Sequence, residues 1–117
     1  MARRSLSRSA CFCGPSHQGT LPATGSVAAL IGTATKRQPY FVGKPNPLMM
    51  RLALNYLGVH SEDAVMIGDR MDTDIIAGVQ TGLSTILVLT GVTPAEAVGR
   101  YPYQPSRVVD SVAEIMP

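Results

Sequence analysis

Three carboxylates fall within six residues, at Asp69, Asp72 and Asp74, directly after a short apolar run. Carboxylate oxygens suit a hard cation such as Mg²⁺, which takes an octahedral shell and usually keeps several waters. Asp69 has the best position for such a cation, and Asp74, one helical turn further on, could orient Asp69 or a metal-bound water. An aspartate after a strand also commonly caps the next turn, so the spacing alone leaves both roles open.

Lys44 is the cation that the sequence holds most rigidly, because Gly43 and Pro45 flank it in a turn. Proline fixes φ and restricts the residue before it. Its ammonium could neutralise a phosphate or carboxylate that the acids would otherwise repel. A lysine in a turn is also commonly only solvated.

The acids need a strand before them and a helix after them. Ala64–Ile67 is too short for an ordinary helix and predicts a strand buried on both faces. Apolar spacing predicts a helix over Thr73–Thr81, capped by Asp72 and closed by Gly82. Thr85–Leu89 predicts a second strand. Ligands of open α/β sheets bind beyond the carboxyl ends of the strands, where these acids stand.

The segments upstream of this unit have weaker patterns. A helix is predicted from Thr24 to before Pro39, and Tyr40–Val42 is a short β-type run. Asn46 followed by Pro47 predicts a helix start, cap then first-turn proline. Gly58 closes that helix. Its expected buried side consists of Met49, Leu52, Ala53, Tyr56 and Leu57.

Downstream, Thr93-Pro94-Ala95-Glu96 has the form of a capping box before a short helix. Arg107–Val109 predicts an edge strand and Ser111–Ile115 a last helical turn. His60 has no evident partner and is assigned to the surface, whereas methionines and tyrosines at helical spacing are assigned to the core.

Composition favours one domain without a membrane span. The chain has 117 residues, and no apolar run approaches the roughly 18 that a span requires. Seven cations and no acids precede Glu62, and eight acids face three arginines from there on, which gives +7 and −5. The cations are scattered with few aromatics among them, which argues against nucleic-acid binding.

The first residues have no clear period. Residues 1–19 are rich in Arg and Ser and superficially fit a transit peptide, but we expect an unstructured leader or sequence that does not belong to the fold. Cys11 and Cys13, with His17 nearby, do not have the usual zinc spacing. We expect free thiols in a reduced, cytoplasmic compartment. Dinucleotide and P-loop glycine motifs are absent from the sequence.

The chain carries three motifs in a fixed order: Gly43–Pro47, Gly68–Gly78 and Leu87–Val92. Together they resemble the carboxyl-terminal half of a haloacid-dehalogenase-like (HAD) phosphatase, of the NagD and 4-nitrophenylphosphatase branch. The resemblance extends from about Leu21 to Ile115. Receiver domains also combine acids, a threonine and a lysine, but their lysine follows the acids, whereas Lys44 precedes them.

The resemblance implies an α/β fold, a partial Rossmann-like HAD core with a parallel sheet. It implies hydrolysis of a small phosphorylated metabolite through Mg²⁺, an aspartate nucleophile and a covalent aspartyl-phosphate. In that family the lysine matching Lys44 stabilises the nucleophile and the transferring phosphoryl group. The aspartate matching Asp69 binds Mg²⁺, and the one matching Asp74 supports the metal site. Phosphoryl transfer is mainly positioning and charge neutralisation, which these residue types provide.

The chain departs from the family upstream of the lysine. The family's nucleophile lies in an Asp-x-Asp motif, followed by a Thr or Ser motif and a cap domain, whereas no Asp occurs here before Asp63. We expect residues 20–117 to form a core without the nucleophile strand and most of the cap, through truncation, a gene remnant or a misread start. Such a chain should be inactive alone and unstable, with an exposed hydrophobic edge on the strand bearing Asp69.

Two alternatives stay open. The chain could be a non-enzymatic module or gene remnant that keeps the HAD fold to bind a partner, such as a complementing amino-terminal fragment or its own copy. It could instead belong to another HAD-superfamily hydrolase, a dehalogenase or phosphonatase, because these enzymes share the Lys and Asp positions. The cap sets most of the substrate choice in this family, so the sequence names no substrate.

Overall fold

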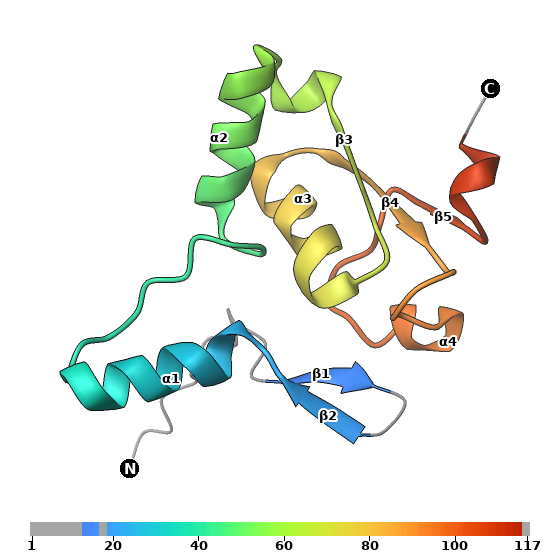
Figure 1. Ribbon diagram of the computed structural model, residues 1–117. Helices are drawn as coiled ribbons and strands as arrows, with labels where there is room; N and C mark the ends of the chain where they lie inside the picture. The colour runs from blue at the N-terminus through green and yellow to red at the C-terminus, as the bar shows by residue number, and fades with distance from the viewer. Residues whose placement is uncertain (1–12, 17–18, 116–117) are drawn as a thin grey trace. The chain divides into compact units, whose positions relative to one another are not determined.

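The computed structural model describes residues 13–16 and 19–115 of the chain. The chain divides into two compact units, Met1–Gly43 and Lys44–Pro117, and each is considered by itself. In the first unit, strands β1 (Cys13–Ser16) and β2 (Gly19–Pro22) pair antiparallel and precede helix α1 (Thr24–Thr35), as Figure 1 shows.

The expectation of an unstructured leader is wrong for Cys13–Ser16, which is strand β1. The backbone of a hairpin forms its hydrogen bonds without any alternation of apolar side chains, so no pattern indicated this strand. Residues 1–12 and 17–18, which include Cys11 and His17, lie outside the described residues.

Helix α1 confirms the prediction from Thr24, and it ends at Lys36 in the left-handed conformation with φ 58°. The expected strand at Tyr40–Val42 is wrong, because this segment is irregular. A strand requires a partner for its backbone groups, and none of the described strands pairs with this segment. Residue type alone therefore did not determine its conformation.

Helix α2 (Pro47–Leu57) begins the second unit's secondary structure and has both predicted ends. The Asn46 Oδ1 atom accepts a hydrogen bond of 2.9 Å from the Leu48 amide, and Pro47 occupies the first turn. Gly58 closes the helix with φ 68°, a conformation that glycine adopts without strain. Local chemistry thus sets where α2 starts and stops.

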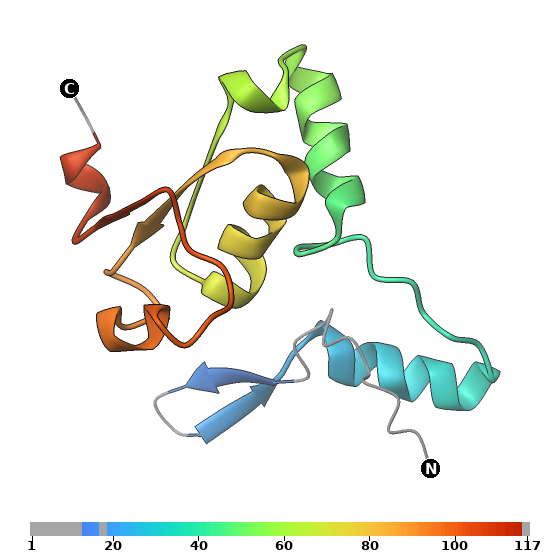
Figure 2. The same cartoon turned by 180° about the vertical axis from the view of Figure 1, so that it is seen from behind.

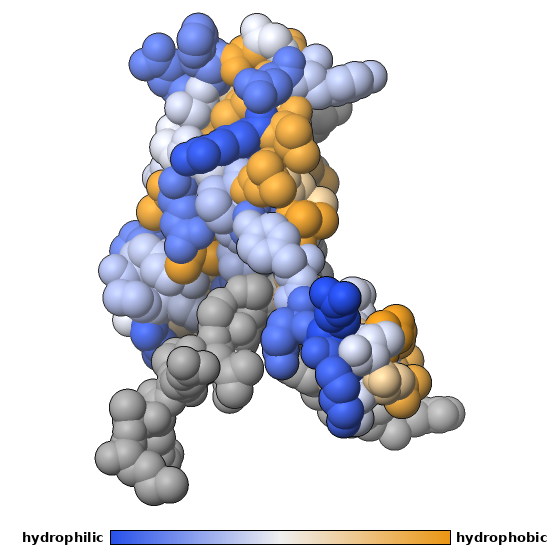
Figure 3. All heavy atoms as spheres, turned by 90° about the vertical axis from the view of Figure 1, so that its left-hand side faces the viewer, coloured by the Kyte–Doolittle hydropathy of each residue, from blue (hydrophilic) through white to orange (hydrophobic). Residues whose placement is uncertain are grey.

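The predicted buried side of α2 is wrong. Leu52 is 59% exposed and Tyr56 is 92% exposed, so neither belongs to the core. Met50 and Leu54, four residues apart, are the less exposed side chains, and α2 lies beside α3 (Ile76–Thr81) in both Figure 1 and Figure 2. Apolar residues occur around most of α2, so periodicity could not select the face. Figure 3 shows the apolar surface that gathers on the α2 side.

A parallel sheet of β3 (Val65–Gly68), β4 (Ser84–Val88) and β5 (Arg107–Val109) confirms the α/β class. The strand order is β3-β4-β5, and Gly68 lies opposite Leu87. A π-helical turn over Met71–Ile75 joins β3 to α3. The predicted strand, helix and strand are therefore present, with the acids between the first two.

Strand β3 is not buried on both faces, as its apolar composition predicted. Val65 is 53% exposed and Ile67 is 43% exposed, and β3 stands at an edge of the described sheet. Apolar composition reports a preference for burial but not whether a neighbour covers the strand. The expected exposed hydrophobic edge is confirmed.

The core lies under the acidic turn. Met71, Ile75 and Leu87 are fully buried, and four partly buried side chains pack against them: Leu89, Val98, Tyr101 and Tyr103. The last three come from the carboxyl end of α4 (Ala95–Val98) and the irregular segment after it. The turn that carries the acids is thus fixed by packing below it.

None of the described helices is long and apolar enough to traverse a bilayer.

Gly78 allows α3 to lie close to the sheet. A Cβ atom there would overlap the Thr85 methyl group and approach Met66 Cβ to 3.0 Å. We expect Gly78→Ala to destabilise the chain by about 1–3 kcal/mol, because a packed interface has no room for the methyl group. Gly99→Ala is the matched control, since a Cβ at Gly99 meets no atom within 4 Å. Urea unfolding of both variants measures the difference, and equal stabilities would contradict this packing.

Candidate active site

The acids lie where β3 ends and the π-helical turn begins. Gly68 is the last residue of β3, and a Cβ there would overlap the Asp74 side chain. Glycine is therefore required for Asp74 to approach the end of the strand. Asp69 follows Gly68, so the carboxylates of Asp69 and Asp74 flank the same strand end.

Asp74 is a buried carboxylate with both oxygens bound. It is 4% exposed; its Oδ1 accepts from Lys44 Nζ at 2.7 Å and its Oδ2 accepts from the Arg70 amide at 3.2 Å. The Lys44 side chain is 42% exposed, so its ammonium contacts both the acid and solvent. The peptide bond between Lys44 and Pro45 is cis. The structure therefore joins two of the predicted site residues in one ion pair.

Asp69 is held from the other side, by the loop after β4. Its Oδ2 accepts a hydrogen bond of 2.8 Å from the Val92 amide, and its backbone carbonyl accepts one of 3.0 Å from the Thr93 amide. A Cβ at Gly91 would overlap the Asp69 side chain, so the loop needs glycine to come this close. Asp69 Oδ1 has no partner among the described residues, and it is not fully buried, so it is at least partly open to solvent.

Asp72 does not cap the helix as predicted. It lies inside the π-helical turn, and its two oxygens accept from Arg70 Nε at 3.0 Å and Arg70 Nη2 at 2.8 Å. Both Asp72 oxygens are occupied by the Arg70 guanidinium. The helical turn also begins at Met71, one residue before Asp72, so Asp72 does not stand at the cap position. The hydrogen bond from Arg70 holds the pKa of the Asp72 carboxyl below its ordinary value of 3.8, against the opposing effect of burial.

Thr93 does not form the predicted capping box. Helix α4 begins at Ala95 without a side-chain cap, and the Thr93 hydroxyl instead accepts from the Met71 amide at 3.2 Å. Tyr103 supports the same residue, because its hydroxyl donates to the Met71 carbonyl at 2.9 Å. Burial raises the pKa of this Tyr103 phenol. Neither side chain could be assigned to the turn from sequence, because each contacts it from 22 or 32 residues away.

Asp69 fits Mg²⁺ as one ligand of a partly aquated ion. One of its oxygens is positioned by Val92 and the other is partly open to solvent, and Mg²⁺ commonly takes one or two carboxylates together with waters and phosphate oxygens. Asp74 is less suitable because both its oxygens are already bound. The described part of the chain contains no group of three His, Cys, Asp or Glu side chains that could hold an ion.

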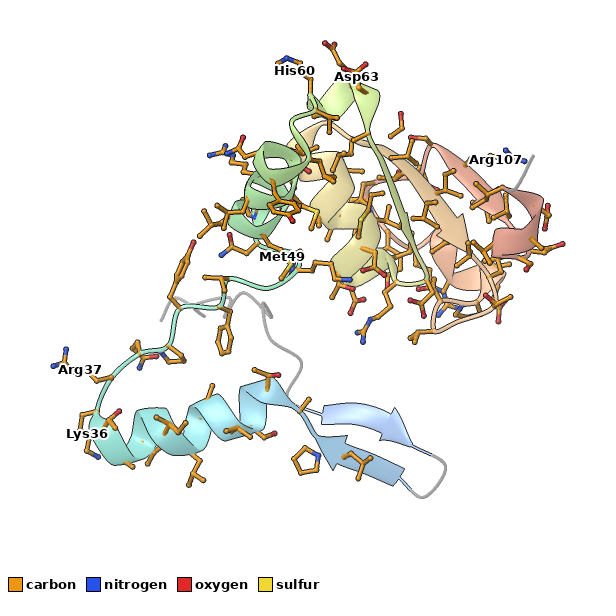
Figure 4. The ribbon with its side chains drawn as sticks, turned by 45° about the horizontal axis from the view of Figure 1, so that its top comes forward. Lys36, Arg37, Met49, His60, Asp63 and Arg107 are labelled. Carbon is orange, nitrogen blue, oxygen red and sulfur yellow. The ribbon has the colours of Figure 1, made fainter. Side chains whose placement is uncertain are left out.

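The structure joins Lys44 and Asp74 in an ion pair, and Asp69 directly precedes Arg70, whose amide donates to Asp74. Lys44 and Asp69 share no direct hydrogen bond in the described structure. His60 lies apart from this site, and Figure 4 shows it pointing outward near Asp63, close to the start of β3. The individual roles assigned to Lys44, Asp69 and Asp74 stay predictions.

The Arg70 and Asp72 pair predicts a pH-dependent contribution to stability. A carboxyl with a lowered folded-state pKa stabilises the chain above its ordinary value of 3.8, and this stabilisation disappears as pH falls through the folded-state pKa. The Asp72 side chain is 51% exposed, so we expect Asp72→Asn to cost only roughly 0.2–1 kcal/mol at pH 7. Urea unfolding between pH 7 and pH 2 should show that cost at pH 7 and a smaller cost as the pH falls. Asp63→Asn, at an exposed acid without an ion pair in the described structure, is the control.

Comparisons with known proteins agree with this arrangement. The family model for HAD-hydrolase-like proteins matches residues 41–115. The chain is 58% identical to dihydroxyacetone phosphatase of Corynebacterium glutamicum over 102 residues, which covers 87% of this chain and 37% of that protein. It is 47% identical to ribonucleotide monophosphatase NagD of Escherichia coli over 98 residues, which covers 84% of this chain and 39% of that protein.

Solved structures show the same fold. NagD from Escherichia coli superposes with a TM-score of 0.79 at 43% identity, over 91% of this chain and 41% of that one. A 4-nitrophenylphosphatase from Thermotoga maritima gives 0.78 at 38% identity, over 90% of this chain and 41% of that one. The chain thus spans about two fifths of the length of these relatives. It belongs to the HAD-hydrolase-like family, in the branch of NagD and the 4-nitrophenylphosphatases.

Proposed function

We propose that this chain supplies the lysine and the acidic motif of a Mg²⁺-dependent phosphomonoesterase. The observation that carries the proposal is the ion pair between Lys44 and buried Asp74, at the end of β3 where Asp69 has an oxygen partly open to solvent. An ammonium and a metal-binding carboxylate at one strand end are the groups that phosphoryl transfer requires. The relatives named above are phosphatases, which supports the same class.

Each residue has a distinct task in this proposal. Asp74 orients the Lys44 ammonium, which attracts the phosphoryl oxygens and stabilises their charge. Asp69 presents its solvent-accessible oxygen to Mg²⁺, and Val92 prevents that carboxylate from turning. When bound, Mg²⁺ would neutralise charge on the transferring group and align it. The hydrogen bond from Arg70 to Asp74 keeps the strand end and the lysine in register.

The nucleophile of the proposed reaction is an aspartate in an Asp-x-Asp motif, which forms an aspartyl-phosphate. This sequence has no Asp before Asp63, so the nucleophile must come from a polypeptide segment outside these 117 residues. The 117-residue chain alone should then hydrolyse phosphomonoesters negligibly. Names of the relatives support a small phosphorylated metabolite as the substrate class. The two cysteines support a reduced, cytoplasmic compartment.

A chimera tests the proposal. Residues 21–117 would replace the matching carboxyl-terminal part of the Corynebacterium relative, which is 58% identical over the shared region. We expect the chimera to hydrolyse 4-nitrophenyl phosphate with Mg²⁺ and the 117-residue chain to show no turnover. Asp69→Asn should reduce kcat of the chimera by at least about 100-fold, because removing a charge-stabilising group commonly costs that much.

Controls separate chemistry from folding. Asp110→Asn changes an exposed acid after β5 and should leave kcat of the chimera unchanged. Lys44→Arg, which keeps a cation beside Asp74, should lower kcat while circular dichroism retains the folded signal. Turnover by the 117-residue chain that disappears in Asp69→Asn would show that no external nucleophile is needed. A chimera that is folded but insensitive to Asp69→Asn would refute the proposed role of Asp69.

The exposed edge of β3 favours a second candidate, a non-enzymatic module that binds a partner. Val65 and Ile67 are apolar and exposed at 53% and 43%, beside unpaired backbone groups of an edge strand. Such an edge pairs readily with another strand. We propose a second copy of this chain as its occupant, with a complementing amino-terminal segment as the alternative.

Charge on the edge strand tests this candidate. We expect the wild-type chain to self-associate at micromolar concentrations and Val65→Lys to reduce that association, because an edge lysine opposes strand pairing. Val112→Lys is the matched control, since Val112 is 55% exposed in a 3-10 turn outside the sheet. Sedimentation velocity measures the mass distribution. A monomeric wild-type chain with a cooperative melt would contradict this candidate.

A further inference from the structure

The loop after β4 contacts the acidic turn through three hydrogen bonds. The Val92 amide donates to Asp69 Oδ2 at 2.8 Å, and the Thr93 amide donates to the Asp69 carbonyl at 3.0 Å. The Met71 amide donates to the Thr93 hydroxyl at 3.2 Å. Two of these three bonds involve Thr93, so this residue sets the register of the loop against the turn.

Thr93 acts where the turn has no local cap. The first amides of a helical segment have no partner within it, and a side chain just before the segment usually accepts from them. Here Arg70 occupies that position and its side chain makes no capping bond, while Asp72 is bound to Arg70. Thr93 is 6% exposed, and its hydroxyl accepts from the Met71 amide instead. A residue 22 positions downstream therefore caps the turn and fastens the loop to it.

The position of Val92 depends on this attachment. Val92 directly precedes Thr93 and is 52% exposed, so little packing holds it in place. Its amide is the one described donor to the Asp69 carboxylate, and that bond leaves Oδ1 partly open to solvent. If the loop moved away, Asp69 could rotate about its side-chain bonds. The hydrogen bonds of Thr93 thus hold the loop in the position from which the Val92 amide orients the Asp69 carboxylate.

We propose that Thr93 is a positioning residue for Asp69: by capping the Met71 amide it holds the Val92 amide on Oδ2 and presents Oδ1 to a divalent cation. The inference rests on the proposed function, because it takes Asp69 as the metal ligand. Groups that orient a metal ligand typically change metal affinity by about 10–100-fold when removed. For Thr93, which acts through one intervening amide, we expect the lower end of that range.

Thr85, in strand β4, provides a matched control. It is fully buried, and its hydroxyl accepts from the Ser106 amide at 3.0 Å, which ties β4 to the segment before β5. Thr85→Val and Thr93→Val each replace a buried hydroxyl by a methyl group and leave one amide without its acceptor. Both should destabilise the chain. Thr93→Val alone should alter Asp69.

The experiment uses the 117-residue chain with ¹⁵N labelling and Mn²⁺ as the probe, because Mn²⁺ accepts carboxylate ligands and broadens nearby amide signals. We expect wild-type chain to show broadening at the Asp69 and Val92 amides that Asp69→Asn abolishes. Thr93→Val should need roughly tenfold more Mn²⁺ for the same broadening. Its Val92 amide should also exchange faster with solvent. Thr93→Ser, which keeps the hydroxyl, should restore both values, and Thr85→Val should change neither.

The outcomes separate this inference from the proposed function. Wild-type chain without Asp69-dependent broadening would refute the metal role of Asp69, and exchange of the Val92 amide would still decide the role of Thr93. Val92 exchange in Thr93→Val no faster than in Thr85→Val would overturn the inference. If Thr93→Val does not fold, Thr93→Ala is used in its place, because it adds no methyl group against the Met71 amide. If neither Thr93 variant folds while Thr85→Val does, Thr93 is a folding determinant and the inference is also rejected.

Discussion

The buried carboxylate of Asp74 is the constraint on which the site depends. A buried charge is costly unless it is paired and hydrogen-bonded, and Asp74 meets that requirement with Lys44 on one oxygen and the Arg70 amide on the other. Lys44 lies 30 residues upstream, just before α2, so the pair fixes the start of that helix against the end of β3. Gly68 supplies the space that this arrangement needs. One electrostatic requirement therefore determines a large part of the second unit's geometry.

The sequence predicts the features that depend on local chemistry. Asn46 caps α2 through its own side chain, and Gly58 and Gly82 end helices with positive φ. Strand β4 lies within one residue of its predicted bounds, and β5 has the bounds that Arg107–Val109 predicted. In each case the deciding interaction lies within a few residues, so residue type and spacing contain the information. The family could likewise be predicted, because residue types and their order along the chain, with Lys44 before the acids, are read directly from the sequence.

Features that depend on distant partners could not be predicted. Thr93 has the sequence of a helix cap, but its hydroxyl binds Met71, and nothing within four residues of Thr93 indicates that partner. Asp72 was assigned to a cap because the pattern did not show that the π-helical turn begins at Met71. The exposed sides of α2 and β3 depend on which neighbours cover them, and apolar composition does not specify a neighbour. The pairing of Lys44 with Asp74 likewise required the three-dimensional structure.

The location of the core explains how the site can be ordered while β3 is exposed. Met71, Ile75 and Leu87 are buried at the acidic turn, and Tyr103, which packs against them, donates a hydrogen bond to the Met71 carbonyl. None of these contacts involves the open side of β3. The carboxylates are therefore positioned by packing and hydrogen bonds on one side of the strand, and its other edge stays free for pairing. A strand that docked there would end beside Asp69, because parallel neighbours in a sheet end at the same edge.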